Sequence, residues 1–344
     1  MRIAIVTDAW HPQVNGVVRT LATTAECLRS MGHATIIVSP EGLPSIPCPT
    51  YPEIRLSLSA RRAVTSRLED CQADAVHIST EGPLGLAARS WCLQHHQPFT
   101  TAYHTQFPEY LRARLPIPLR ASYAWLRRFH APAVRTLVST QSMRRTLAAR
   151  GFRHLAQWGR GVDCELFRPR DKAWLDLPRP VSVYVGRLAV EKGVEEFLAL
   201  DLPGTQMVIG DGPARESLAR RYPQAVFTGY LQGEALACHI AASDVMVFPS
   251  RTDTYGLVML EALACGVPVA AYPVTGPIDV IEQHVTGILN DDLRLATLAA
   301  LQLDPVNCRR AAMRRSWEAC TRQFLQALAC EESDWIGTNC GNPS

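Results

Sequence analysis

The stretch VSVYVGRLAVEKG at residues 181–193 decides how the fold is interpreted. Its first five residues form a short apolar run, which predicts a buried strand. A loop follows, and it carries two cations, Arg187 and Lys192, before the next helical segment. A strand that leads through such a loop into a helix is the repeating unit of parallel α/β sheets. The second half of the chain is therefore predicted to be an α/β domain.

The same alternation of short apolar runs and helical segments continues on both sides of this stretch. In the second half, further strands are expected at residues 206–209, 226–228, 245–248 and 267–271. In the first half, strands are expected at residues 2–7, 34–38, 75–78, 99–103 and 136–139, with an amphipathic helix at 17–31. This alternation favours parallel, doubly wound sheets.

The length of 344 residues favours two domains. A first Rossmann-like domain is expected at residues 1–170, and a second at 171–305, after a proline-containing linker at 167–180. A C-terminal helix at 306–330 is expected to pack back onto the first domain, and residues 331–344 to form a loose tail. Two such domains would place the carboxyl edges of their sheets on either side of a cleft.

Composition excludes several classes of protein. Hydrophobic residues make up 47% of the chain and charged residues 19%, which argues against disorder. The first apolar run ends at Asp8, and the longest, at 256–272, is interrupted by Glu261, Gly266 and Pro268, so neither a signal peptide nor a membrane span is expected. The eleven cysteines form no C-x-x-C pair, which favours reduced thiols and a cytoplasmic location over a zinc site.

Charge is divided unequally between the halves. Residues 1–170 carry 21 Arg against 11 Asp and Glu, or +10, whereas the remainder carries 14 basic and 21 acidic residues, or −7. A basic half can meet an anionic partner, although a solvated arginine-rich surface would look the same. The basic half contains a segment in which arginines alternate with apolar residues, namely Arg112, Arg114, Arg120, Arg127, Arg128 and Arg135 among Tyr110, Leu111, Leu115, Leu119, Tyr123, Trp125, Leu126 and Phe129. This segment predicts either contact with an anionic membrane or an ordinary helix pair with solvated arginines.

Two further segments have the composition of an anion site. Asn15-Gly16 precedes a helix after the first strand, which alone is a weak signal because such pairs are common in turns. In the segment FPSRTDTYGLVMLEALACG at 248–266, a helix is expected to begin near Gly256, so the amides of residues 255–257 would face a bound anion. Glu261 lies in an apolar helix, where a carboxylate is costly unless it binds ligand hydroxyls or a partner in the core.

Several of these segments together resemble a known family. The stretches GRLAVEKG, GDGP at 210–213, TGYL at 228–231 and FPSRTDTYGLVMLEALACGVPV are similar to the retaining GT-B glycosyltransferases of family 4. The stretches TDAWHPQVNGV, TEGPLG at 80–85, YHTQFPEY at 103–110 and GRGVD at 159–163 resemble the branch with bacterial α-mannosyltransferases and sulfoquinovosyl-diacylglycerol synthases. The family's signature has two glutamates separated by seven residues, and here Asp253 stands at the first of these positions and Glu261 at the second.

The resemblance implies a role for each matching residue. Gly16, Arg187 and Lys192 would bind the donor diphosphate, Asp253 the sugar hydroxyls and Glu261 the ribose, while His104 would lie beside the transferred sugar. The remaining residues expected around the donor are Gly210, Gly212, Leu231, Thr254, Tyr255, Gly256 and Leu257. His104 and Glu261 could instead be satisfied core residues.

The implied activity is transfer of a hexose from GDP-mannose or a UDP-hexose to a hydroxyl acceptor, lipid or glycan, with retention. Fixed cations and helix amides would stabilise the departing diphosphate, so neither a metal nor a cofactor is expected, and the sequence contains no Asp-x-Asp motif. The expected partners are the donor, the acceptor and an anionic membrane surface, without nucleic acid. A nucleotide-sugar epimerase and a non-catalytic nucleotide-sugar or glycan-binding protein remain as alternatives.

Overall fold

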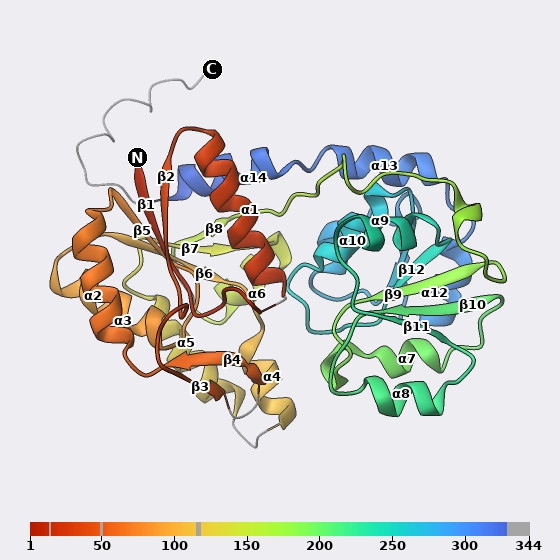
Figure 1. The fold of residues 1–344 in the computed structure, drawn as a ribbon, viewed down its shortest axis with the longest axis horizontal. Coiled ribbons are helices and arrows are strands. Elements are labelled where there is room, and N and C mark those ends of the chain that lie inside the picture. Colours follow the sequence, from red (N-terminus) through yellow and green to blue (C-terminus); the bar gives the residue numbers. More distant parts are fainter. Residues whose placement is uncertain (14, 49–50, 115–117, 329–344) are drawn as a thin grey trace.

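The computed structural model describes residues 1–13, 15–48, 51–114 and 118–328, which form two α/β lobes side by side (Figure 1). The expected tail at 331–344 lies outside the described residues. Among the residues described, no helix is long and apolar enough to cross a membrane.

The first lobe contains a six-stranded parallel sheet in the order β2-β1-β5-β6-β7-β8. Its strands are β1 (Arg2–Val6), β2 (Ala34–Val38), β5 (Ala75–Ile78), β6 (Phe99–Tyr103), β7 (Arg135–Val138) and β8 (Leu155–Gln157). Apolar side chains of α1 (Gly16–Ser30) and α14 (Trp317–Ala327) pack on one face, and those of α2 (Ala60–Cys71) and α3 (Pro83–Gln94) on the other. The lobe also contains α4 (Phe107–Arg114), α5 (Leu119–His130), α6 (Gln141–Ala149) and an antiparallel pair, β3 (Ser45–Cys48) and β4 (Tyr51–Ser57).

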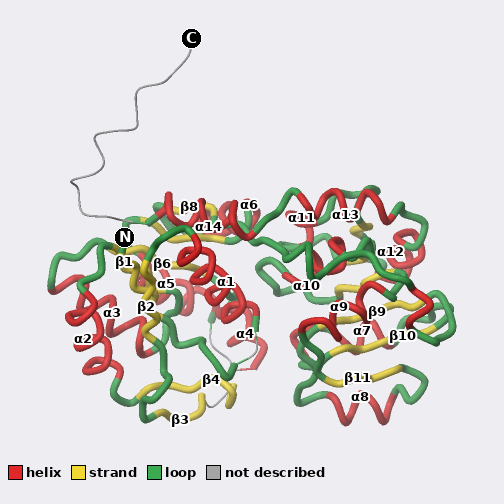
Figure 2. Tube along the Cα trace, turned by 45° about the horizontal axis from the view of Figure 1, so that its top comes forward, coloured by secondary structure: helices red, strands yellow, loops and turns green. Residues whose placement is uncertain are grey.

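The second lobe contains a parallel sheet of the same size, in the order β11-β10-β9-β12-β13-β14. Its strands are β9 (Val181–Val185), β10 (Thr205–Ile209), β11 (Val226–Gly229), β12 (Val245–Phe248), β13 (Val269–Ala271) and β14 (Gly287–Leu289). Side chains of α9 (Gly233–Ala241), α10 (Leu257–Ala264) and α13 (Pro305–Met313) pack on one face, and those of α7 (Val194–Leu198) and α8 (Arg215–Arg221) on the other. The remaining helices are α11 (Pro277–Val280), α12 (Leu293–Ala300) and two short 3-10 segments, Lys172–Trp174 and Val190–Lys192. Figure 2 shows helices on both sides of the strands in each lobe, which confirms the predicted pair of doubly wound sheets.

The chain crosses between the lobes earlier than the boundary expected at residue 170. Val162 and Phe167 already pack in the core of the second lobe. The chain returns to the first lobe after α13, and the two crossing segments meet where the Val162 amide donates to the Arg315 carbonyl at 3.1 Å. A Cβ at Gly161 would lie 2.3 Å from the Trp317 nitrogen, so the two segments approach each other too closely for any side chain there.

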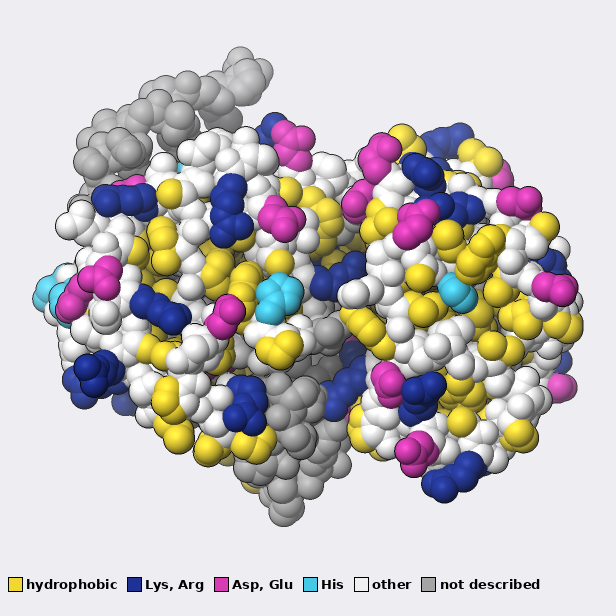
Figure 3. All heavy atoms as spheres, in the orientation of Figure 1, with side chains coloured by type: hydrophobic (Ala, Val, Ile, Leu, Met, Phe, Trp, Pro, Cys, Tyr) yellow, Lys and Arg dark blue, Asp and Glu magenta, His cyan; other side chains and the backbone are white. Residues whose placement is uncertain are grey.

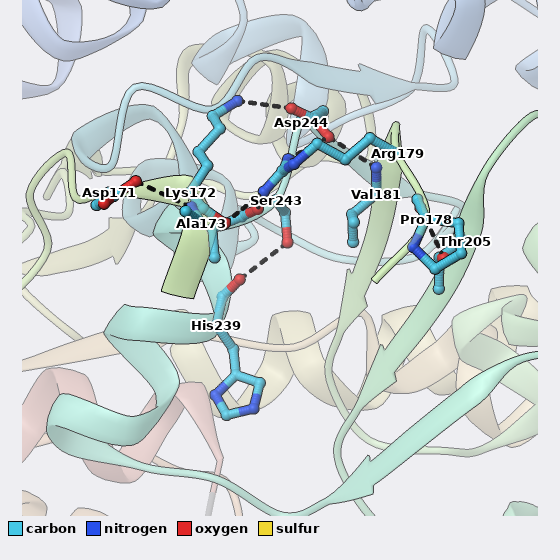
Figure 4. Close-up of polar contacts among 11 residues, drawn as sticks. Asp171, Lys172, Ala173, Pro178, Arg179, Val181, Thr205, His239, Ser243 and Asp244 are labelled. Atoms are coloured by element: carbon cyan, nitrogen blue, oxygen red, sulfur yellow. Dashed lines mark hydrogen bonds and ion pairs between the residues drawn. The ribbon is translucent and has the colours of Figure 1, made fainter. Parts of the chain in front are cut away.

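Asp244 holds part of the linker to the second lobe (Figure 4). Asp244 accepts hydrogen bonds from Lys172 at 2.8 Å, from Arg179 at 2.7 Å and from the Val181 amide at 2.7 Å. Burial opposes ionisation of this carboxyl, but these bonds outweigh it and lower the pKa of Asp244. Residues 172–181 are therefore fixed to the second lobe, although their proline-rich composition is typical of a linker.

The C-terminal segment contains two helices and not the single helix expected at 306–330. The helix α13 ends at Met313 and packs against α10, whereas α14 begins at Trp317, where Ser316 caps it by accepting from the Ala319 amide. The break falls at the return crossing, so each lobe is covered by one of the two helices. Phe324 of α14 is fully buried against Trp158 and strand β1 of the first lobe.

Candidate functional site

Lys192 and Asp253 meet at the junction of the two lobes' facing edges. The loop after β9 leads through the 3-10 turn Val190–Lys192 to Gly193, whose φ of 65° is left-handed. The Lys192 ammonium lies 2.5 Å from a carboxylate oxygen of Asp253, and the two side chains are 22% and 19% exposed. Arg187 lies in the same loop, which is fixed where the Tyr184 hydroxyl donates to the Arg187 carbonyl at 2.8 Å. The structure thus brings Lys192 and Asp253 into contact, two residues that the sequence assigned to the same donor substrate. Figure 3 shows basic side chains at the junction between the lobes.

Gly210 and Gly212 shape this loop from the next strand. Their φ angles are 143° and 155°, and a Cβ would lie 1.9 Å from the Gly186 oxygen at Gly210 and 2.5 Å from the Leu188 oxygen at Gly212. Both glycines are therefore required for the 210–213 loop to pack against the loop that carries Arg187. Leu231, which follows β11, is half-buried against the core of the second lobe. Their contacts with a donor stay a prediction.

The N-terminus of α10 has no side-chain cap. Gly256 precedes it with a φ of 81°, and a Cβ there would lie 2.7 Å from the Met259 methyl and 2.9 Å from the Phe248 ring. The helix amide dipoles at this end favour an anion. The preceding residues contact the first lobe, because the Thr254 hydroxyl donates to the His104 carbonyl at 2.7 Å and the Tyr255 hydroxyl donates to the Arg160 carbonyl at 3.4 Å. The Tyr255 side chain is buried in this contact, and burial raises its pKa.

Glu261, one turn further along α10, is 2% exposed. One carboxylate oxygen forms an ion pair with Arg19 of α1, and the other has no hydrogen-bond partner in the described part of the chain. Gly16 and Arg19 lie three residues apart on α1, and a Cβ on Gly16 would lie 3.7 Å from a Leu257 methyl. One face of α1 therefore meets the face of α10 that carries Leu257 and Glu261. Arg19 was not predicted from the sequence as a site residue. Its position three residues after Gly16, on the same face of a helix, was the signal that could have found it.

The N-terminus of α1 is already capped. The Asn15 side chain accepts hydrogen bonds at 3.0 Å from the amides of Val17 and Val18. Both amides already donate to the Asn15 side chain. The expectation that an anion binds this helix N-terminus is therefore wrong for these two amides. Gly16 itself lies at the contact with α10.

His104 follows β6 at the carboxyl edge of the first sheet. Its ring lies edge-on to Trp158, and the Arg160 guanidinium donates to its Nδ1 at 3.2 Å. Its Nε2 is buried without a partner in the described chain. Burial first, and then the charges of Arg160, His77 and His130, hold the pKa of His104 well below its usual range. His104 is therefore neutral at pH 7.

Asp8 organises the edge beside His104, a role that the sequence did not reveal. Its buried carboxylate accepts from the Thr80 hydroxyl at 2.8 Å and from the amides of Leu84 and Gly85 at the start of α3, at 2.9 and 3.3 Å. A Cβ at Gly82 would lie 2.5 Å from this carboxylate. Burial raises the Asp8 pKa despite these bonds. The TEGPLG stretch is thus fixed by one side chain that lies more than seventy residues away in the sequence.

The arginine-rich segment is partly core. Tyr123, Leu126 and Phe129 of α5 are buried, so for these three residues the interpretation as an ordinary packed helix is right. Arg120, Arg127 and Arg128 are exposed, Trp125 is 44% exposed, and Arg112 of α4 is exposed. Arg135 instead donates to carbonyls of α14. Leu115 and the side chains of Tyr110, Leu111 and Arg114 lie outside the described residues.

Comparison with known proteins identifies the family. Residues 14–166 match the model of Glycosyltransferase Family 4, and residues 179–303 match that of Glycosyl transferases group 1. A GDP-mannose-dependent alpha-mannosyltransferase of Mycolicibacterium smegmatis is 34% identical over 85% of this chain and 84% of its own. The chain therefore belongs to the family 4 glycosyltransferases, and it transfers a sugar from a nucleotide sugar.

Other relatives bear on the branch and the fold. The sulfoquinovosyl transferase SQD2 of Arabidopsis thaliana is 33% identical over 76% of this chain and 57% of its own. A GDP-mannose-dependent alpha-(1-6)-phosphatidylinositol dimannoside mannosyltransferase of Mycobacterium tuberculosis is 25% identical over 99% of both chains. The solved structure of Anabaena HepE with UDP and glucose superposes with a TM-score of 0.71, at 15% identity over 95% of this chain and 98% of that one. These similarities confirm the predicted branch and the GT-B fold.

Proposed function

We propose that this enzyme transfers mannose from GDP-mannose, with retention and without a metal or cofactor, to a hydroxyl of a lipid acceptor. The choice of donor is supported by the Mycolicibacterium smegmatis relative, which is 34% identical over 85% of this chain and is named as GDP-mannose-dependent. GDP-mannose is an α-glycosyl phosphate, so an α-mannoside formed from it keeps the anomeric configuration. The bacterial relatives that match across most of this chain are named as transferases, which favours transfer over epimerisation.

The proposed donor site rests on one carboxylate oxygen of Glu261, which is buried and has no hydrogen-bond partner in the described part of the chain. A buried carboxylate oxygen without a donor costs free energy, and two ribose hydroxyls would supply the missing hydrogen bonds. Arg19 forms an ion pair with the other oxygen of Glu261 and so holds the carboxylate in place to accept these bonds. A ribose on Glu261 would direct the diphosphate toward the uncapped N-terminus of α10, one turn away.

The diphosphate would then share Lys192 with Asp253. As the glycosidic bond breaks, negative charge grows on the departing diphosphate, and Lys192, Arg187 and the α10 amides would stabilise it. These groups are fixed by the fold before the reaction, which limits reorganisation in the transition state. Asp253, released in part from Lys192, would accept hydrogen bonds from sugar hydroxyls.

The exposed residues of α5 support a lipid acceptor. Arg120, Arg127 and Arg128 are exposed on the same helix as Trp125, which is 44% exposed, and Arg128 lies three residues after it. This helix belongs to the first lobe, which carries the acceptor side of the proposed cleft. Cations beside an amphipathic ring suit the headgroup region of an anionic membrane. The relative that acts on phosphatidylinositol dimannoside agrees with this choice.

The proposal is tested by incubating the protein with GDP-mannose, UDP-glucose and UDP-galactose in parallel. Diacylglycerol, phosphatidylinositol and a membrane lipid extract serve as acceptors, and products are identified by mass spectrometry and by the anomeric NMR signal. We expect an α-mannosyl lipid from GDP-mannose, formed equally well with EDTA. A β-linked product would overturn retention, and loss of activity with EDTA that Mn²⁺ or Mg²⁺ restores would overturn the metal-free mechanism.

A further inference from the structure

Arg160 is a buried arginine at the crossing between the lobes, and its guanidinium is held rigidly. The side chain is 6% exposed, and its Nη1 donates to the carbonyls of Trp158 at 2.6 Å and Gly159 at 2.8 Å. The guanidinium also lies over the Trp158 ring, 4.5 Å from the centroid. Nη2 of the guanidinium donates to Nδ1 of His104 at 3.2 Å. These contacts fix the direction in which Nη2 donates.

This hydrogen bond determines where the His104 proton lies. A guanidinium has donors and no acceptor, so Nδ1 of His104 must be the acceptor in this pair. Burial lowers the pKa of Arg160 to about 10, which leaves it charged at neutral pH. A neutral imidazole that accepts at Nδ1 carries its proton on Nε2. Arg160 therefore selects one of the two tautomers of His104.

The Nε2–H of this tautomer has no acceptor in the described part of the chain, although it is buried. A buried donor without a partner is rare in proteins and indicates a ligand that completes the site. The backbone of His104 is also fixed, since its carbonyl accepts from Thr254 of the donor-side loop. Both the ring and the main chain of His104 are thus held in place by residues from outside its own strand.

We propose that Arg160 is a positioning residue that holds His104 as the neutral Nε2–H tautomer, so that this N–H donates to an oxygen of the transferred sugar. The inference rests on the proposed function for the identity of that oxygen. The protein groups that act on the ring are Arg160, His77 and His130. All three oppose its protonation, so the ring donates one hydrogen bond and keeps an acceptor nitrogen on the side of Arg160.

The tautomer is measured directly by NMR of the full-length protein labelled with ¹⁵N-histidine. The His104 signals are assigned by their loss in His104→Gln. We expect a protonated Nε2 and an unprotonated Nδ1 in the wild type and in Arg160→Lys, whose ammonium also only donates. In Arg160→Met we expect the two tautomers to mix and kcat/KM for the donor to fall about 10- to 100-fold. Arg160→Lys should recover most of this loss.

Arg89→Met is the matched control, because Arg89 also donates to two backbone carbonyls of the first lobe, those of Phe129 and Arg128. It should change neither the His104 signals nor kcat/KM. A wild-type ring protonated at Nδ1 would overturn the proposal, as would an Arg160→Met enzyme with full activity. If Arg160→Met does not fold, the wild type and Arg160→Lys still decide the tautomer. Because the tautomer is observed without turnover, it tests the role of Arg160 separately from the donor assay.

Discussion

At the scale of single residues, the ion pair between Lys192 and Asp253 would link substrate binding to catalysis in the proposed function. Each residue compensates the other's charge at a site that is about four-fifths buried. A diphosphate that binds Lys192 would replace one negative partner of the ammonium, Asp253, with another. Asp253 would then become available to a hydroxyl of the same donor. The Lys192 ammonium would thus pair with Asp253 in the free enzyme and with the diphosphate in the complex, and it would move little between the two.

Replacing Lys192 with alanine should reduce kcat by at least about 100-fold, because a fixed charge that stabilises the transition state is typically worth this much. The chain contains two lysines, and Lys172→Ala is the matched control, since Lys172 pairs with Asp244 on the linker. Steady-state kinetics with saturating donor would separate kcat from KM for both variants. A Lys192→Ala enzyme with kcat within a few-fold of wild type would mean that this lysine does not contact the leaving group.

The sequence predicted Lys192, Asp253 and Glu261 as site residues because each lies in a local strand-to-helix pattern. It did not identify Arg19 or Arg160, whose partners are 242 and 56 residues away. Arg160 has no local pattern that distinguishes it among 33 arginines, and the helical spacing of Arg19 from Gly16 does not show which distant carboxylate Arg19 meets. Such residues are found when the tertiary structure shows which side chains meet.

At the scale of elements, periodicity predicted the parallel strands well and the irregular pieces poorly. The strands expected at 34–38, 75–78, 99–103 and 245–248 agree with the structure at both ends. The β3–β4 pair was missed, since its strand β3, SIPC, has no alternation and contains proline. The break between α13 and α14 was also missed, because residues 314–316, RRS, contain neither proline nor glycine to mark it.

Helix α14 covers a buried histidine of β5, and this makes stability depend on pH. His77 is fully buried against Phe324 and Trp158, and its Nδ1 pairs with the Thr100 hydroxyl at 2.9 Å. Burial, with a smaller effect of Arg160, lowers the pKa of His77 to about 3. The unfolded chain binds this proton near pH 6.5, so acid favours unfolding. The stabilisation is complete above about pH 6.5 and is lost as the pH falls toward 3.

In this window, His77 should contribute about 1.4 kcal/mol per pH unit to the free energy of unfolding. His104 adds a contribution of the same sign. We expect His77→Gln to have a shallower dependence of unfolding free energy on pH than wild type, measured by urea unfolding followed by tryptophan fluorescence. The exposed His95 is replaced by glutamine as a control and should leave the slope unchanged. Equal slopes in wild type and His77→Gln would show that His77 is not held neutral in the native state.

At the scale of the whole molecule, the two halves of the sequence carry opposite net charge, which fits an acceptor-binding first half and a donor-binding second half. The first 170 residues carry +10 and contain the exposed arginines of α5, whereas the rest carries −7. Residues 1–170 build most of the first lobe, so an anionic surface would attract this lobe and orient the enzyme with its acceptor side toward lipid. The two crossing segments at Val162 and Arg315 would keep the donor lobe attached in this orientation.

This orientation predicts salt-sensitive binding to anionic vesicles, measured by flotation with phosphatidylglycerol-containing and pure phosphatidylcholine liposomes. The double variant Arg120→Glu/Arg128→Glu should bind at least about 30-fold more weakly, since each near-surface cation contributes about 1 kcal/mol. Arg127 is left unchanged because it donates to the Arg150 carbonyl at 2.9 Å and its loss would disturb the fold. The matched control, Arg61→Glu/Arg62→Glu, alters two exposed arginines of α2 by the same charge and should bind as wild type does. If wild type stays unbound at low salt, or if the α2 control weakens binding as much, α5 does not contact the membrane and the acceptor is a soluble molecule.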